Sequence, residues 1–293
     1  MKATIRKFFN QFTDEFDDIE LKEPDYLTIL KLIWHVVKSL FKERPGQIIG
    51  STFILLMIWG YHGELELVKL FWKGWVAPGT PPSERIPIIP WIPWDYEIIS
   101  FFAGAFLLVI IPIILIKSFY KLPLFNFGLG LPPKGRRVFA LWTFIVLTTI
   151  CLPVFYFGAQ DESMQRVYPI FKSFSSSRQF ILYELTYLPF FIAIEFIFRG
   201  YLLFGLAGVR DNENKNSGGG APGVFYFSKY ALLIQMLSYT AWHLGKPIPE
   251  LWGTIVWGLA AGILAYASRS IWPVILSHWL LNVFIDAVII KPF

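Results

Sequence analysis

Long apolar runs constrain the fold of this chain more than any other feature of its sequence. They lie at about residues 47–62, 97–116, 138–158, 181–207, 227–243, 251–268 and 271–290. A helix that crosses a bilayer needs about 20 mostly apolar residues, because hydrocarbon offers no partner to the backbone amides and a helix satisfies them internally. None of the runs alternates as the strands of a membrane barrel do. The sequence therefore predicts an all-α polytopic membrane protein, a bundle of about seven to eight transmembrane helices with an amphipathic N-terminal region.

The composition supports a membrane protein over a soluble one. Of the 293 residues, 55% are hydrophobic and only 16% are charged, whereas a soluble domain carries about 25% charged residues. The single cysteine, Cys151, lies inside an apolar run, which excludes both a disulfide framework and a metal site built from cysteines. The lipid bilayer is therefore the first predicted partner.

The distribution of charge predicts the topology. The loop 117–137 holds five basic residues and no acid, so the positive-inside rule makes it cytoplasmic, places 60–96 outside and makes the N-terminus cytoplasmic. These basic residues are Lys117, Lys121, Lys134, Arg136 and Arg137. Because topology already accounts for them, no nucleic-acid partner is predicted. We expect a multi-pass integral protein in the plasma membrane of a bacterium.

Three segments follow from the distribution of polar and apolar residues. Residues 1–45 form a charged N-terminal segment whose stretch 27–43 has the pattern of an amphipathic helix at the membrane surface, although a docking arm for a partner would look the same. Residues 46–120 carry the first spans and a proline-rich external connector at 77–94. Residues 121–293 carry the remaining spans and a polar, glycine-rich loop at 210–223.

Polar residues inside the apolar runs mark a candidate site. A charged side chain at the centre of a membrane helix costs about 2.5–3.5 kcal/mol, so such residues usually face the interior of the bundle. Glu195 and Arg199 are four residues apart in one run, as are His278 and Asn282 in another, so each pair shares a helix face. His243 ends a third run.

The run 251–268 carries small residues that would let the neighbouring helices approach closely. Gly258 and Gly262 form a GxxxG pattern, which is typical of close helix packing in membranes. We expect this packing to bring the polar pairs together.

The order of these polar residues resembles a known family. The chain has E-x-x-x-R-G at Glu195, Arg199 and Gly200, then an aromatic residue and a histidine at Tyr239 and His243, then H-x-x-x-N at His278 and Asn282. Over about residues 120–290 this resembles the CAAX protease and bacteriocin-processing family, also called the Abi membrane protease family.

The resemblance implies an intramembrane endopeptidase that works without a metal or other cofactor on a membrane-associated peptide or protein. By motif position, Glu195 and His243 would activate water, and His278 and Asn282 would hold the developing oxyanion. Arg199 and Tyr239 would support them.

The chain departs from the family motif at one position. The family has two adjacent glutamates, and the first corresponds here to Ile194, so that only Glu195 remains. Neighbouring helix residues point about 100° apart, and Glu184 is three turns away, so neither acid takes the empty position automatically. The alternative is an inactive homologue that serves as a membrane binding, immunity or scaffold protein.

Other interpretations of the polar residues stay open. Glu195 with Arg199, and His278 with Asn282, would also suit a purely structural ion pair and a helix–helix hydrogen bond. Two histidines and a glutamate can bind zinc, although no H-E-x-x-H pattern is present. A transporter would use the same residue types, but the sequence has no visible repeat.

Overall fold

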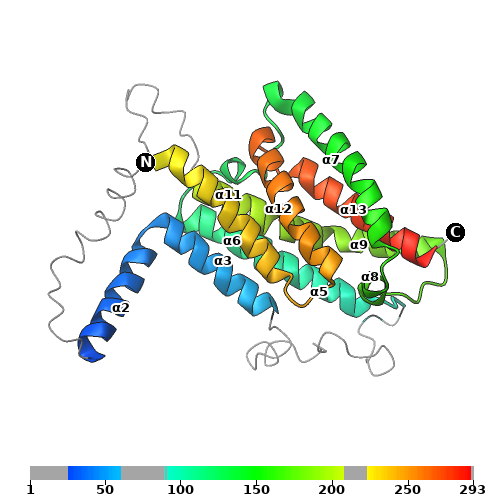
Figure 1. Ribbon diagram of the computed structural model, residues 1–293, viewed down its shortest axis with the longest axis horizontal. Helices are drawn as coiled ribbons and strands as arrows, with labels where there is room; N and C mark the ends of the chain where they lie inside the picture. Colours follow the sequence, from blue (N-terminus) through cyan, green and yellow to red (C-terminus); the bar gives the residue numbers. More distant parts are fainter. Residues whose placement is uncertain (1–25, 61–88, 90, 208–222, 292–293) are drawn as a thin grey trace. The chain divides into compact units, whose positions relative to one another are not determined.

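The computed structural model describes residues 26–60, 89, 91–207 and 223–291. Throughout these ranges the chain forms helices joined by turns, without a strand, which confirms the predicted all-α polytopic fold (Figure 1). The chain divides into two units, Met1–Gln47 and Ile48–Phe293.

The described part of the first unit is mainly the helix α2 (Tyr26–Lys42). It covers almost the whole range in which the sequence predicted an amphipathic helix. Leu30, Ile33 and Trp34 are exposed, as is Lys31. Such a helix presents large apolar side chains that a membrane surface would cover.

Helices account for nearly all of the described second unit. They are α3 (Arg44–Gly60), which starts in the first unit, then α5 (Asp95–Ala105), η2 (Phe106–Ile110), α6 (Ile111–Ile114), η3 (Leu115–Phe119), η4 (Leu124–Phe127), η5 (Lys134–Arg136), α7 (Arg137–Gly158), α8 (Glu162–Val167), α9 (Ser177–Glu195), η6 (Phe196–Phe204), α10 (Gly205–Ala207), α11 (Gly223–Trp242), α12 (Ile248–Ser268) and α13 (Trp272–Ile290).

Each of the predicted spans falls on a helix. Among the described residues, five continuous helices are long and apolar enough to cross a membrane, namely Asp95–Phe119, Lys134–Gly158, Ser177–Ala207, Ile248–Ser268 and Trp272–Ile290. The helices α3 and α11 coincide with the other two predicted spans but are not among these five.

The helix Ser177–Ala207 forms the centre of the second unit. Of its most apolar stretch 83% is buried, against 17–44% for the other four spans. It contacts α5, α11, α12 and α13, while α11 packs along α12 and α7 packs along α13 (Figure 1). The side chain of Ser176 starts the helix by accepting a hydrogen bond from the backbone N–H of Gln179.

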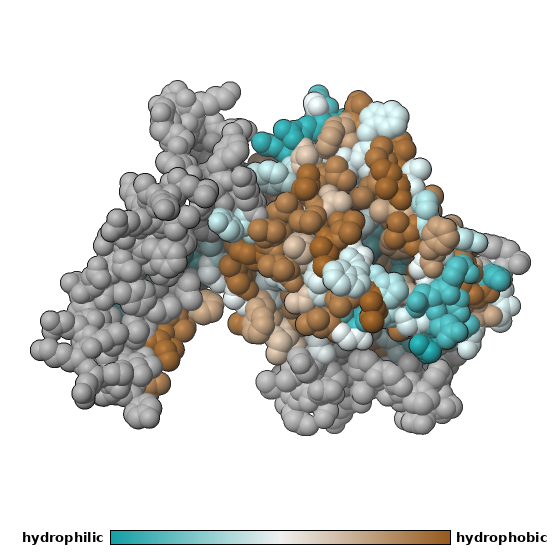
Figure 2. Space-filling model, in the orientation of Figure 1, coloured by the Kyte–Doolittle hydropathy of each residue, from teal (hydrophilic) through white to brown (hydrophobic). Residues whose placement is uncertain are grey.

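The surface of this unit is strongly apolar. Large hydrophobic side chains are exposed along the outer helices, among them Val138, Phe157 and Val256. Figure 2 shows hydrophobic residues spread over most of the visible described surface. A continuous apolar surface of this kind is the one that lipid covers.

The predicted GxxxG packing is confirmed between α11 and α12. A Cβ atom on Gly258 would lie 2.9 Å from Met236 Cγ, and one on Gly262 would lie 2.7 Å from Leu232 Cδ1. The side chain of Gln235 uses the close approach to donate a 2.6 Å hydrogen bond to the carbonyl of Gly258. The small residues therefore set the spacing of these two helices.

Several sequence predictions lie wholly or partly outside the described residues. They concern residues 1–25 of the N-terminal segment, most of the connector 77–94, and most of the loop 210–223.

Candidate functional site

The central helix changes its winding at the candidate site. α9 ends at Glu195, and the next nine residues form the π-helix η6, whose side chains are all buried. π-Helical turns are rare in proteins, and many of those that occur lie at functional sites. Glu195 and Arg199 lie at this junction, and both are fully buried.

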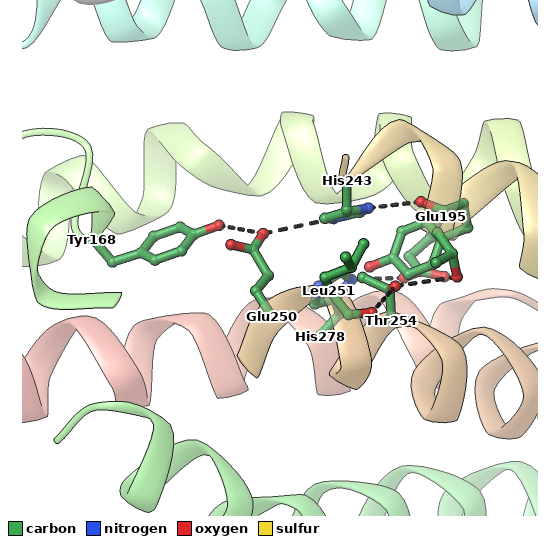
Figure 3. Close-up of polar contacts among 9 residues, drawn as sticks. Tyr168, Glu195, His243, Glu250, Leu251, Thr254 and His278 are labelled. Carbon is green, nitrogen blue, oxygen red and sulfur yellow. Dashed lines mark hydrogen bonds and ion pairs between the residues drawn. The ribbon is translucent and has the colours of Figure 1, made fainter. Parts of the chain in front are cut away.

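Glu195 is enclosed by three polar partners from three helices. Its Oε1 accepts hydrogen bonds from His278 Nδ1 at 2.6 Å and from Trp257 Nε1 at 3.1 Å. Its Oε2 lies 3.3 Å from Arg199 Nε in an ion pair. We call these four residues the inner cluster; Figure 3 shows the contact between Glu195 and His278.

The inner cluster fixes the orientation of His278. Because Nδ1 is directed at the Glu195 carboxylate, Nε2 is the ring nitrogen left for another partner. The ring lies between Phe191 and Trp257, each with its centroid 4.9 Å away. The side chain is 17% exposed, so it is the member of the ion-paired group that reaches the surface of the described structure.

His243 belongs to a second polar group. Its Nδ1 lies 2.7 Å from the carbonyl of Tyr239, and because a carbonyl only accepts, Nδ1 carries a proton. Its Nε2 lies 3.7 Å from Glu250 Oε1, and the same oxygen accepts a 2.7 Å hydrogen bond from the hydroxyl of Tyr168 (Figure 3). We call His243, Glu250 and Tyr168 the outer cluster.

The outer cluster lies where connecting segments meet helix ends. His243 directly follows α11, Glu250 is in the first turn of α12, and Tyr168 directly follows α8. The first turn of a helix favours a carboxylate because the unpaired N–H groups there carry partial positive charge. Burial, followed by the neighbouring charge of Glu250, raises the pKa of Tyr168 well above its usual value, so the phenol stays a donor.

Tyr239 joins the two clusters. The guanidinium of Arg199 lies 4.0 Å from the centre of the Tyr239 ring, and the ring of His243 lies 4.5 Å from it. Both residues are described, and no hydrogen bond or ion pair links Glu195 directly to His243. The pair expected to activate water is therefore connected through an aromatic ring and a cation.

Asn282 points into a third polar group. Its Nδ2 donates a 3.0 Å hydrogen bond to Asp286 Oδ2, and Asp286 interacts electrostatically with Glu184. All three residues are buried. Asn282 shares its helix with His278, as expected from the spacing, but its amide is held by an acid one turn further along α13.

The described residues contain no group of three His, Cys, Asp or Glu side chains arranged to hold a metal ion. The outer cluster brings one histidine and one carboxylate together with a phenol. The inner cluster brings one of each together with a guanidinium and an indole.

Part of the sequence matches the model of a known protein family. Residues 177–284 match the family model described as type II CAAX prenyl endopeptidase Rce1-like. Over these residues the chain is therefore similar to the CAAX protease and bacteriocin-processing family. No curated protein and no solved structure matches the chain.

The matched region begins at the first residue of α9 and ends within α13. It includes all the motif residues that carried the resemblance, and it is narrower than the range 120–290 over which we expected similarity. The family relationship inferred from three short motifs is confirmed over 177–284.

Sequence reasoning missed three members of the two clusters. Glu250 and Tyr168 lie at the ends of spans or between them, where polar residues are common and do not indicate a site. Trp257 lies inside an apolar run, where a tryptophan is usually a packing residue. One signal was available for Glu250. It follows His243 by seven residues across a turn that contains Gly245 and Pro247, and such a turn between antiparallel helices brings the two ends together.

Proposed function

We propose that this chain is an intramembrane endopeptidase of the CAAX protease type that hydrolyses a membrane-associated peptide or protein without a metal. The observation that carries the proposal is the state of the two histidines. In each, Nδ1 is directed at a fixed acceptor, the carbonyl of Tyr239 for His243 and the carboxylate of Glu195 for His278. Each Nε2 is then left for substrate or water.

The surroundings of the two rings suit them to opposite tasks. The Nδ1 partner of His243 is a neutral carbonyl, so a neutral ring with a lone pair on Nε2 fits there and can accept a proton from water. The Nδ1 partner of His278 is a carboxylate, which balances the charge of a ring protonated on both nitrogens. His278 is then the donor to the oxyanion, as its motif position implied.

This assignment changes the role proposed for Glu195. The carboxylate is fully buried and has His278, Trp257 and Arg199 as partners. In this proposal it orients His278 and does not itself contact the attacking water. Asn282, one turn further along α13 than His278, donates its hydrogen bond to Asp286.

The substrate class follows from the setting of the site and from the family. The residues lie among apolar helices, so a substrate has to be anchored in or on the bilayer to reach them. The family description names a prenyl endopeptidase. We therefore propose a peptide whose C-terminal region carries a lipid-modified cysteine as the first substrate to test.

The experiment uses the full chain in proteoliposomes with a fluorogenic peptide anchored through a prenylated cysteine. An otherwise identical peptide anchored through a saturated acyl chain is the comparison substrate. Mass spectrometry identifies the bond that is cut, and a chelator in parallel samples tests the independence from metal. Cleavage of either peptide that survives the chelator and is lost in His278→Ala supports the proposal, whereas no cleavage of either peptide contradicts it.

A second candidate function is supported by one observation. Ile194, at the position of the first motif glutamate, is buried in the apolar core, so the motif acid is replaced by a packing residue. A non-hydrolytic homologue that binds a membrane partner would keep the inner cluster as a scaffold. Specific binding of an anchored peptide without cleavage would favour this candidate.

A further inference from the structure

The chain lacks a carboxylate at the position of the first motif glutamate, and the neighbouring Glu195 is bound by other protein groups. Ile194 is 2% exposed and packs within the hydrophobic core. Glu195 is fully buried and is bound by the inner cluster. A carboxylate that activates water must contact that water, and neither side chain is placed to do so in this structure.

Glu250 has the geometry that these positions lack. Its Oε1 lies 3.7 Å from His243 Nε2, which is too long for a direct hydrogen bond. A single water oxygen can, however, lie within about 2.8 Å of both atoms at that separation. Both side chains are partly exposed, 14% for Glu250 and 9% for His243, so water can reach them.

The hydrogen bonds around Glu250 leave one of its oxygens available. Oε1 accepts from the hydroxyl of Tyr168 at 2.7 Å, which fixes the rotation of the carboxylate. Oε2 is buried and has no hydrogen-bond partner among the described residues. A buried carboxylate oxygen without a hydrogen bond is costly unless a ligand or water completes it.

We propose that Glu250 is the catalytic carboxylate of this chain, holding the attacking water together with His243 in place of the glutamate that Ile194 replaces. The inference rests on the proposed peptidase function. It assigns a role to a residue outside the motif positions and places it on α12, not on the central helix.

Water, His243, Glu250 and His278 are sufficient for the hydrolytic step, and no other reactant is needed. The water oxygen attacks the scissile carbonyl carbon while one water proton moves to His243 Nε2 and the other hydrogen is held by Glu250. The carbonyl π pair moves to the oxygen, which accepts a hydrogen bond from His278 Nε2. When this oxyanion collapses, the C–N bond breaks and the leaving nitrogen takes the proton from His243. The products are a carboxylic acid and an amine.

The test compares Glu250→Gln with Glu162→Gln in proteoliposomes. Glu162 is an exposed acid on the nearby α8, so its substitution is a matched control. We expect Glu250→Gln to lower kcat by about 100-fold or more with KM little changed, because the amide cannot balance the charge that develops on His243. Glu162→Gln should behave like the wild type.

The outcomes separate this inference from the proposed function. Cleavage by the wild type with full activity in Glu250→Gln overturns the role of Glu250 and leaves the peptidase function standing. No cleavage by the wild type overturns both. If Glu250→Gln lowers Tm, Glu250→Asp decides the question. Its carboxylate is kept but withdrawn by one methylene, so kcat should fall at least about tenfold, and an unchanged kcat contradicts the proposal.

Discussion

The inner and outer clusters use the same chemical pair, a carboxylate and a histidine, in two different settings. In the inner cluster Glu195 and His278 are 2.6 Å apart and the carboxylate is fully buried with a cation and an indole. In the outer cluster Glu250 and His243 are 3.7 Å apart, and both side chains reach the surface of the described structure. A closed pair fixes charge, whereas an open pair leaves room for a reactant.

The difference has an energetic cause. A carboxylate as deeply buried as Glu195 is tolerated only beside opposite charge or hydrogen-bond donors, so Oε1 accepts two hydrogen bonds and Oε2 pairs with Arg199. Glu250 keeps partial access to the outside, so water can supply a partner that the protein does not. The pair with the more accessible carboxylate is therefore the one that can exchange a protein contact for water. Substitutions in each of the two clusters test this contrast.

Removing the base of the outer cluster should abolish cleavage without unfolding the protein. For His243→Ala we expect kcat/KM to fall by about 10³- to 10⁴-fold, because proton transfer loses its acceptor. The substituted ring directly follows α11 and pairs with a partly exposed carboxylate, so Tm should fall less than in a variant that breaks the fully buried ion pair of Arg199. The measurement is the initial rate on the anchored fluorogenic peptide.

The matched control for this substitution is His35→Ala, on the exposed side of α2. Full activity there with loss in His243→Ala supports the contrast. Substantial cleavage by His243→Ala would remove the outer cluster from the chemistry.

Breaking the inner cluster should instead lower stability. Arg199→Met leaves the Glu195 carboxylate buried without its cation, and removing one partner of a buried ion pair costs about 3–5 kcal/mol. Reversible unfolding in mixed micelles would measure the loss as a fall in the free energy of unfolding.

The double substitution Glu195→Gln with Arg199→Met provides the internal control. It removes both charges, so it should recover part of the stability lost in Arg199→Met. If the double variant loses as much unfolding free energy as the two single variants lose together, the two side chains do not stabilise each other.

Removing the hydroxyl of Tyr168 should have an intermediate effect that is confined to rate. A hydrogen bond to a charged group contributes about 1.5–3 kcal/mol, so Tyr168→Phe should lower kcat by about 10- to 100-fold if Glu250 must be held in place. Tyr156→Phe, at an exposed phenol on α7, should leave kcat unchanged. Equal rates in the two variants would show that Tyr168 does not orient the carboxylate.

The smallest expected effect concerns the spacing of the helices that carry the outer cluster. At Gly258 a Cβ would lie 2.9 Å from Met236 Cγ and 3.3 Å from Met236 Cα, so Gly258→Ala should destabilise the protein by about 1 kcal/mol. Gly253 has no atom within 4 Å of the corresponding point, so Gly253→Ala should be neutral or slightly stabilising. Thermal unfolding of the two variants measures the difference, and equal Tm values would contradict close packing at Gly258.

The sequence predicted the spans well and the contacts at the site only in part. Hydrocarbon requires long apolar helices, so the runs 138–158 and 251–268 were visible without any knowledge of packing. The spacing of Glu195 and Arg199 likewise implied their contact, which the structure contains. Local rules determine both features.

The remaining contacts depend on how separate helices meet. The spacing of His278 and Asn282 predicts that they share one face of a helix. It does not predict that His278 contacts Glu195 or that Asn282 contacts Asp286. The π-helix η6 also changes which side chains of the central helix face its neighbours, and the sequence carries no simple sign of it. Glu250 was missed for a related reason, because the cost of burial identifies acids inside apolar runs and not acids at their ends.

The ring of Tyr239 has a further consequence for any study of this centre. It contacts both the guanidinium of Arg199 in the inner cluster and the imidazole of His243 in the outer cluster. Residues with a shared partner do not contribute independently, so the penalties of Arg199 and His243 substitutions should fail to add. The two clusters therefore behave as one thermodynamic unit. A substitution that only destabilises the inner cluster should also change the rate constants that depend on the outer cluster.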